Sequence, residues 1–219
     1  MFNLKQIITS IADAGQKLFN KKEVESNLKI MFDKKTILVS YHSVTTISKI
    51  ENIFQFKQVL DALRLYKKLN IIFTSPNIDP GNTDILTMIK KFIKQNKNAY
   101  FFKSLGQRLF FSVAKNSNIF IGNSSSGILE VPFLNIPVLN IGNRQKGRFQ
   151  FVKIFNSNPK KEIIIKNINR ILKEKINFLP FDSNLIKNAS YIITKNIIRK
   201  LKNKECTYMN NKIFNDLKF

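Results

Sequence analysis

Cysteine, histidine and tryptophan are nearly missing from this sequence of 219 residues, which holds one cysteine, one histidine and no tryptophan. The single cysteine, Cys206, excludes a disulfide within the chain and any metal cluster built on cysteines. Because His42 is the only histidine, we expect no transition-metal site and no cofactor. One cysteine suits a reducing compartment, so we predict a cytoplasmic protein.

Long apolar stretches are missing as well. No run approaches the roughly 18 apolar residues that a membrane-spanning helix requires. The first residues, MFNLKQIITS, lack a basic segment followed by an apolar one, so no signal peptide is expected. We therefore expect no membrane partner.

Three common motifs are absent. The loop GNSSSG at 122–127 does not have the GxSxG spacing of a nucleophile elbow, and no second histidine is available as a base. No GxxxxGK[ST] segment exists, and Gly127 lacks the GxGxxG spacing. Serine-hydrolase, P-loop and dinucleotide-fingerprint interpretations are thus unsupported.

Acidic residues are few, with 14 Asp and Glu against 37 Lys and Arg and a net charge of +23. Such an excess suggests nucleic-acid binding. However, only six of these residues are Arg and no run of five or more basic residues occurs. We interpret the charge as a solvated basic surface that favours anionic ligands, and expect no specific nucleic-acid partner.

The apolar content of 43%, with 20 phenylalanines, is sufficient for one globular core. Apolar runs predict strands over 36–41, 70–74, 99–102, 119–121 and 136–141. Apolar periodicity predicts helices over 3–19, 21–28, 49–69, 107–116, 128–131, 161–175 and 184–202. A further helix is predicted to reach about residue 94, with Asn82 or Thr83 as its N-cap. Asn20 and Glu23 form a predicted capping box for the second helix. This alternation predicts an α/β fold with a Rossmann-like parallel sheet flanked by helices.

We expect a helical lead-in over 1–34, the Rossmann-like domain over 35–180, and a C-terminal helix and tail over 181–219. In such sheets ligands bind beyond the C-terminal ends of the strands. The polar and loop residues that fall just past predicted strand ends are His42, Asn77, Ser104, Leu105, Ser124, Ser125 and Arg144. One ligand could touch all of them.

The segment 119–148 contains the densest group of candidates. Its small-residue loop lets backbone N–H groups and hydroxyls converge on an anion at a helix N-terminus. Glu130, about one turn inside the predicted helix, could accept hydrogen bonds from a sugar diol. Arg144 carries a fork suited to phosphate. Together they predict a site for a nucleoside diphosphate.

Each candidate also has a purely structural interpretation. His42 could be a satisfied structural residue, and Ser124 and Ser125 could cap a helix. Asn77 and Asp79 could be turn formers. Glu130 could face solvent, and Arg144 could pair with a surface carboxylate.

Five segments in a fixed order resemble a known family. They are HSVT at 42–45, PNIDPG at 76–81, SLG at 104–106, GNSSSG at 122–127 with Glu130, and NIGNRQKGR at 140–148. On these segments the chain resembles, over roughly residues 20–200, the C-terminal half of the hydrolysing UDP-N-acetylglucosamine 2-epimerases that feed sialic and legionaminic acid synthesis. In that family the residue after the histidine is usually proline, and here it is Ser43.

The resemblance implies the C-terminal, UDP-binding domain of a GT-B-type enzyme. It implies that Ser124, Ser125 and Arg144 hold the diphosphate, and that Glu130 binds the ribose hydroxyls. Ser104 and Leu105 would contact the uracil side, and Asn77 would lie near the nucleotide. His42 is the implied catalytic residue, beside the diphosphate and the reacting sugar.

The implied reaction expels UDP from UDP-N-acetylglucosamine, or a related UDP-N-acetyl sugar, by anti elimination. Water then adds to the resulting glycal to give N-acetylmannosamine. The N-terminal domain, which in the family supplies the acidic residues for proton transfer, has no counterpart in the 219 residues. We therefore expect little activity from this chain alone, and as partners a UDP-sugar, a separately encoded N-terminal domain and a homo-oligomer.

Two other functions stay open at this point. The chain could be the nucleotide-sugar-binding domain of a GT-B glycosyltransferase. It could also be an inactive UDP-binding remnant or a basic nucleic-acid binder, whose binding to duplex DNA would depend on salt.

Overall fold

The computed structural model describes residues 18–148, 150, 154–174, 176, 194–195 and 198–199. The chain divides into two compact units, and the larger one, 13–181, contains every helix and strand named below. The helices predicted over 3–19 and 184–202 fall almost wholly outside the described residues. The three domain ranges expected from the sequence stay predictions.

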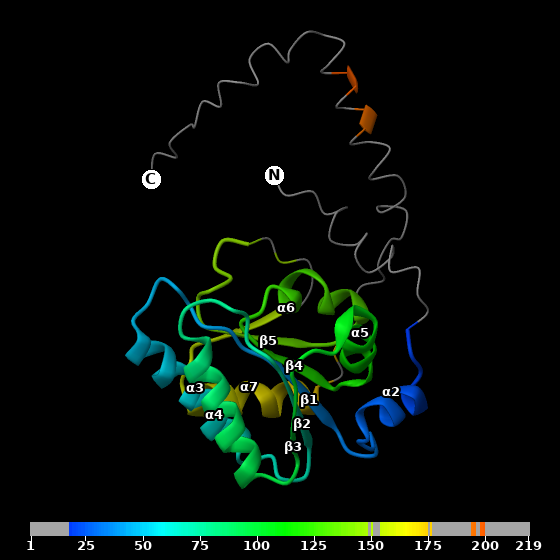
Figure 1. The fold of residues 1–219 in the computed structure, drawn as a ribbon, viewed down its shortest axis with the longest axis horizontal. Coiled ribbons are helices and arrows are strands. Elements are labelled where there is room, and N and C mark those ends of the chain that lie inside the picture. The colour runs from blue at the N-terminus through cyan, green and yellow to red at the C-terminus, as the bar shows by residue number, and fades with distance from the viewer. Residues whose placement is uncertain are drawn as a thin grey trace. The chain divides into compact units, whose positions relative to one another are not determined.

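Six parallel strands form one sheet in the order β3-β2-β1-β4-β5-β6 (Figure 1). The strands are β1 (Thr36–Ser40), β2 (Asn70–Thr74), β3 (Ala99–Phe102), β4 (Ile119–Gly122), β5 (Val138–Ile141) and β6 (Ile154–Ser157). Strands β1, β2 and β4 read as nearly continuous apolar runs, as expected where both faces of a parallel sheet are covered. The predicted α/β class with a Rossmann-like parallel sheet is confirmed.

Helices cover both faces of this sheet. Helices α3 (Lys49–Leu63), α4 (Asn82–Gln95) and α7 (Lys161–Lys173) pack on one face with Ile37 and Val39 of β1. On the other face, α2 (Lys21–Leu28), α5 (Gly106–Asn116) and the 3-10 helix η1 (Val131–Leu134) pack with Leu38. Alternate residues of a strand point to opposite faces, so one strand serves both cores.

Helix α2 begins with the predicted capping box. The Asn20 Oδ1 accepts the Glu23 N–H at 3.0 Å, and the Glu23 Oε2 accepts the Asn20 N–H at 2.7 Å. Two backbone donors that the first helical turn leaves unpaired are satisfied in this way.

Two predicted boundaries are wrong and one strand was missed, each for an identifiable reason. The helix predicted to reach residue 69 ends at Leu63, and the Asn98 side chain donates to the carbonyls of Tyr66 and Leu69 in the following turns. The last predicted strand begins at Val138, because Pro137 has no N–H for the ladder. Strand β6 was not predicted, since it has only four residues, two of them polar, at the edge of the sheet.

The helix predicted over 128–131 is also displaced. Helix α6 spans Ser126–Leu129, and Glu130 is its C-cap rather than an interior residue. Pro132 has no N–H to donate to the carbonyl of Ile128, so the α-helical hydrogen-bond pattern cannot continue past this point. The chain therefore turns into η1 after a single turn of α-helix.

Candidate functional site

The candidate site lies at the C-terminal ends of the strands, where the strand order reverses between β1 and β4. Connections that leave neighbouring strands in opposite directions open a crevice at this point, which is where α/β proteins bind ligands. His42 follows β1 by two residues, and Asn123 directly follows β4. Asn77 and Arg144 come three residues after β2 and β5.

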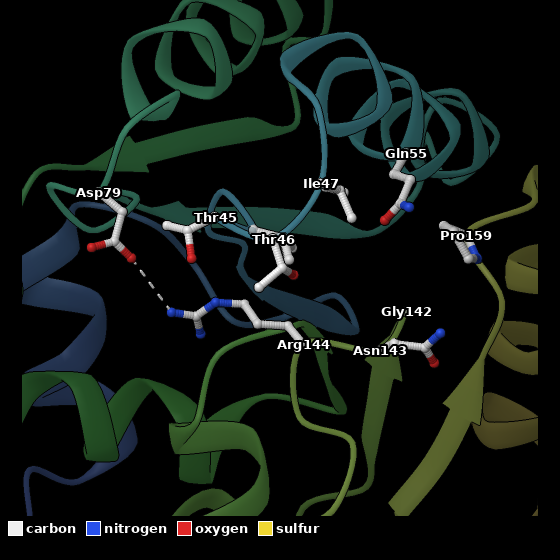
Figure 2. Close-up of a pocket in the computed structure, with 10 residues that line it drawn as sticks. Thr45, Thr46, Ile47, Gln55, Asp79, Gly142, Asn143, Arg144 and Pro159 are labelled. Atoms are coloured by element: carbon white, nitrogen blue, oxygen red, sulfur yellow. Dashed lines mark ion pairs between the residues drawn. The ribbon is translucent and has the colours of Figure 1, made fainter.

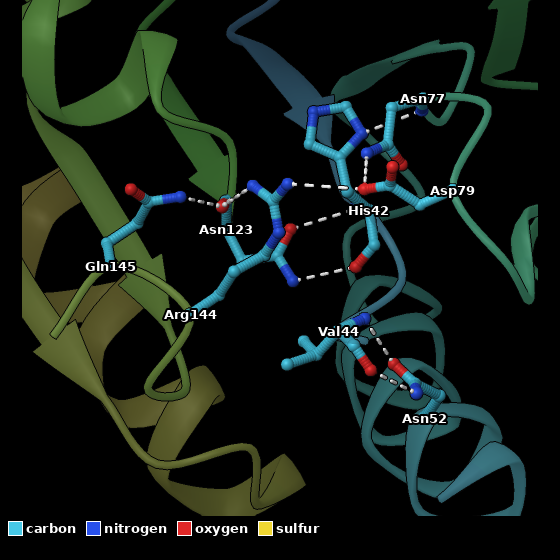
Figure 3. Close-up of polar contacts among 8 residues, drawn as sticks. All are labelled: His42, Val44, Asn52, Asn77, Asp79, Asn123, Arg144 and Gln145. Carbon is cyan, nitrogen blue, oxygen red and sulfur yellow. Dashed lines mark hydrogen bonds and ion pairs between the residues drawn. The ribbon is translucent and has the colours of Figure 1, made fainter. Parts of the chain in front are cut away.

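Asn123 connects three of these loops (Figure 3). Its Oδ1 accepts the His42 N–H at 2.8 Å, and its Nδ2 donates to the His42 carbonyl at 2.8 Å. Its own carbonyl accepts from the Arg144 Nη1 at 3.2 Å and from the Gln145 Nε2 at 2.7 Å. Asn123 and Gln145 are each 1% exposed, so these bonds fix the loops relative to one another.

The His42 imidazole is held in one tautomer. Its Nδ1 accepts the backbone N–H of Asn77 at 3.0 Å, so the neutral ring carries its proton on Nε2. Burial and, to a lesser extent, the Arg144 charge lower the pKa of His42 to about 4, and the Asp79 carboxylate opposes this shift. At neutral pH His42 is therefore an uncharged ring whose Nε2–H can donate.

Arg144 and Asp79 form an ion pair in the lining of a cavity of about 400 Å³ (Figure 2). The cavity is lined by Val44, Thr45, Thr46, Ile47, Gln55, Asp79, Gly142, Asn143, Arg144 and Pro159. The Arg144 Nη2 lies 3.7 Å from the Asp79 Oδ2, which also accepts from the Asn77 Nδ2. The Asp79 side chain is 39% exposed, so this ion pair is screened by water and a stronger anion could replace the carboxylate.

The serine loop leads into a helix of a single turn. Ser124 is buried and its Oγ accepts the Ser126 N–H at 3.3 Å, whereas Ser125 makes no capping hydrogen bond through its side chain. Helix α6 has only four residues, so its dipole is small. The guanidinium of Arg144, which donates to the Asn123 carbonyl, places a full positive charge beside this loop.

Not all of the predicted residues belong to this network. Ser104 and Leu105 follow β3, the edge strand two positions from β1, or roughly 10 Å away at strand spacing. The Ser104 Oγ accepts the Gly106 N–H at 3.3 Å, and Leu105 packs against the α5 side of the core. Glu130 is half-buried at the end of α6.

Four buried side-chain atoms in the described part of the chain have no hydrogen-bond partner: Ser43 Oγ, Asn77 Oδ1, Asn140 Oδ1 and Gln145 Oε1. All four residues lie at or just beyond the C-terminal ends of β1, β2 and β5. Buried polar atoms are nearly always paired in folded proteins. A polar ligand over this edge would supply the missing partners.

Sequence reasoning missed Asn123 and Gln145. The available signal was an amide directly after a strand and another beside Arg144, but neither pattern indicates which distant loop the amide contacts. Among the described residues, no three His, Cys, Asp or Glu side chains gather into a potential metal site. Nor does any helix in those residues have the length and apolar character to cross a membrane.

Comparisons with known proteins agree with the resemblance. Residues 7–191 match the UDP-N-acetylglucosamine 2-epimerase family. The hydrolysing GDP/UDP-N,N'-diacetylbacillosamine 2-epimerase of Campylobacter jejuni is 34% identical over 158 residues, which are 72% of this chain and 41% of that protein. The hydrolysing UDP-N,N'-diacetylbacillosamine 2-epimerase of Legionella pneumophila is 32% identical over 148 residues, 67% of this chain and 38% of that protein.

Solved structures show the same fold. The UDP-GlcNAc 2-epimerase of Methanocaldococcus jannaschii, in complex with UDP-GlcNAc and UDP, has a TM-score of 0.58 at 17% identity, over 88% of this chain and 52% of that one. The chain spans about two fifths of the length of the curated relatives it matches. The chain belongs to the UDP-N-acetylglucosamine 2-epimerase family.

Proposed function

We propose that this chain is the C-terminal, UDP-binding part of a hydrolysing 2-epimerase that converts a UDP-N-acetyl sugar to UDP and an N-acetylmannosamine-type product. Family membership and the names of the relatives support the reaction class. The observation that carries the proposal is the network of Asn123, which holds His42 and Arg144 together at the switch point of the sheet.

In this proposal the site stabilises the leaving group. Breaking the bond between the sugar and the diphosphate moves negative charge onto UDP. Arg144 would pair with the diphosphate in place of Asp79, and the Nε2–H of His42 would donate to a phosphate oxygen. Ser124 and Ser125 would add hydroxyl donors. Because these donors are fixed before the ligand arrives, little reorganisation opposes the charge transfer.

The other nucleotide contacts follow the rim. Ser104 and Leu105, toward the edge of the sheet, would contact the uracil, while Glu130 would accept from the ribose hydroxyls. Asn77, which follows β2, would lie between the uracil contacts of Ser104 and Leu105 and the diphosphate. In this proposal the elongated nucleotide lies across the strand ends and spans the roughly 10 Å between β3 and β1.

Proton removal from the sugar needs a general base that these residues do not supply. The Nδ1 lone pair of His42 is occupied by the Asn77 N–H, and Nε2 carries the proton. We therefore assign proton transfer to acidic residues of an N-terminal domain, in the same protein or a separate partner. We also propose that the protein forms a homo-oligomer and that it is located in the cytoplasm.

A thermal-shift titration of the full chain with UDP tests the nucleotide site. Because a ligand that binds only the folded state raises its stability, millimolar UDP should raise the melting temperature. UMP, which lacks the second phosphate, is the matched control and should give a smaller shift. Equal shifts for both nucleotides, or none, would contradict a diphosphate site at Arg144.

A reconstitution assay tests the division of labour. We expect almost no release of N-acetylmannosamine from UDP-N-acetylglucosamine by the chain alone, and turnover after an N-terminal half is added. Full activity without a partner would show that the base is in this chain. Sugar transfer to an acceptor, without free N-acetylmannosamine, would support a glycosyltransferase instead.

A further inference from the structure

A second hollow of about 410 Å³ lies beside the first and shares Gly142 and Asn143 with it. It is lined by Asn140, Gly142, Asn143, Lys146, Gly147, Gln150, Asn156, Ser157, Asn158 and Ile163. Half of these residues carry side-chain amides, and none carries a carboxylate. Such a lining suits a neutral ligand with both hydrogen-bond donors and acceptors.

Three of the amides that line this hollow form a chain of hydrogen bonds. Asn140 and Asn156 are register partners on β5 and β6, and the Asn140 Nδ2 donates to the Asn156 Oδ1 at 2.9 Å. The Asn156 Nδ2 donates in turn to the Gln150 Oε1 at 3.2 Å. The chain leaves the Asn140 Oδ1 without a partner, although Asn140 is only 4% exposed.

This buried acceptor needs a donor. An unpaired polar atom in the interior is costly, whereas a bound N–H group would remove that cost. The interior amides of Asn123 and Asn52 complete their bonding on both oxygen and nitrogen, whereas the buried amide oxygens of Asn140, Asn77 and Gln145 have no partner. Among these unpaired amides, Asn140 is the one that lines the second hollow.

We propose that the hollow binds an acetamido group of the sugar, with its N–H donating to the Asn140 Oδ1. The acetamido carbonyl would accept from the side-chain amides or Lys146 at the rim, and its methyl would rest against Ile163. The inference rests on the proposed function, because the sugar reaches this hollow only when the diphosphate occupies the neighbouring cavity at Arg144. It adds the residues that recognise this acetamido group, with Asn140 as the acceptor of its N–H.

Calorimetric titration of the full chain with UDP, UDP-N-acetylglucosamine and UDP-glucose tests this site. The two sugar nucleotides differ at C2, where UDP-glucose has a hydroxyl in place of the acetamido group. We expect UDP-N-acetylglucosamine to bind about tenfold more tightly than UDP-glucose, the size of one good hydrogen bond. In Asn140→Ala and Asn156→Ala this preference should fall to within about twofold while UDP binds unchanged.

Asn156 is exposed, so its truncation leaves the core intact and decides the matter if Asn140→Ala does not fold. Gln95→Ala, which removes an exposed amide on α4, is the matched control and should keep the preference. Equal affinities in the unmodified chain, or a preference that survives Asn156→Ala, would overturn the inference and leave the UDP site standing. Failure of UDP itself to bind would instead overturn the proposed function.

Discussion

The protonation of His42 offers a stability test that needs no ligand. Its pKa is about 4 in the folded chain against 6.5 for an unperturbed histidine, because burial and Arg144 disfavour the cation. Between these values the unfolded chain binds a proton that the folded chain does not. Stability therefore falls as the pH is lowered from 6.5 toward 4, and the loss from pH 7.5 to pH 5 is about 2 kcal/mol.

The perturbation that isolates this effect is His42→Asn. The asparagine Oδ1 can still accept the Asn77 N–H, but the side chain does not titrate. Urea unfolding of both proteins at several pH values between 7.5 and 5 gives the two free energies of unfolding. Because both proteins carry the same carboxylates, the wild-type value minus the variant value reports on His42 alone.

We expect the free energy of unfolding of the wild type, minus that of the variant, to decrease by about 2 kcal/mol as the pH falls from 7.5 to 5. The wild type becomes less stable relative to the variant because its unfolded chain takes up a proton at His42. A difference that stays constant would mean that the fold does not hold His42 neutral. A difference that increases toward low pH would mean that Asp79 stabilises the cation more than burial and Arg144 destabilise it. Either result would refute the role of His42 as an uncharged donor.

Three further substitutions test other parts of the structure. Arg144→Lys keeps the charge but loses the planar fork that reaches the Asn123 carbonyl, so calorimetry should show UDP affinity reduced about tenfold; equal affinity would contradict the fork. Gly122→Ala would place its Cβ 1.8 Å from the Ser40 carbonyl oxygen at a φ of +148°, so we expect no folded protein by circular dichroism, and a stable variant would contradict this packing. Asn20→Ala removes the N-cap of α2 and should lower the free energy of unfolding, measured in urea, by about 1 kcal/mol. An unchanged value would show that the capping box of Asn20 and Glu23 does not stabilise the fold.

Much of the fold could be predicted from the sequence because its signals are local. The strands at 70–74 and 99–102 were predicted at their observed bounds, since short apolar runs between turn formers leave few alternatives. The capping box at Asn20 depends on residues three apart. The break before η1 was also encoded locally, in Pro132, but the sequence reasoning extended the helix toward it.

The candidate site was only partly predictable. That His42, Asn77, Ser124 and Arg144 share one edge of the sheet follows from their places after parallel strands. The sequence alone does not indicate that a proline-free, half-polar segment at 154–157 joins the sheet as β6, and without β6 the amide-lined hollow does not exist. An edge strand has one neighbour, so its own composition constrains it weakly.

The sequence by itself determined the alternation of strands and helices, the family resemblance and the edge at which polar residues gather, because periodicity, caps and strand ends are properties of neighbouring residues. Only the tertiary structure decided that Asn123 holds His42 across 81 residues, that the Asn77 N–H selects the histidine tautomer, and that Arg144 faces Asp79. These contacts depend on the order of the strands in the sheet. Hydrogen bonds between loops form only after that order has brought distant segments within about 3 Å of one another.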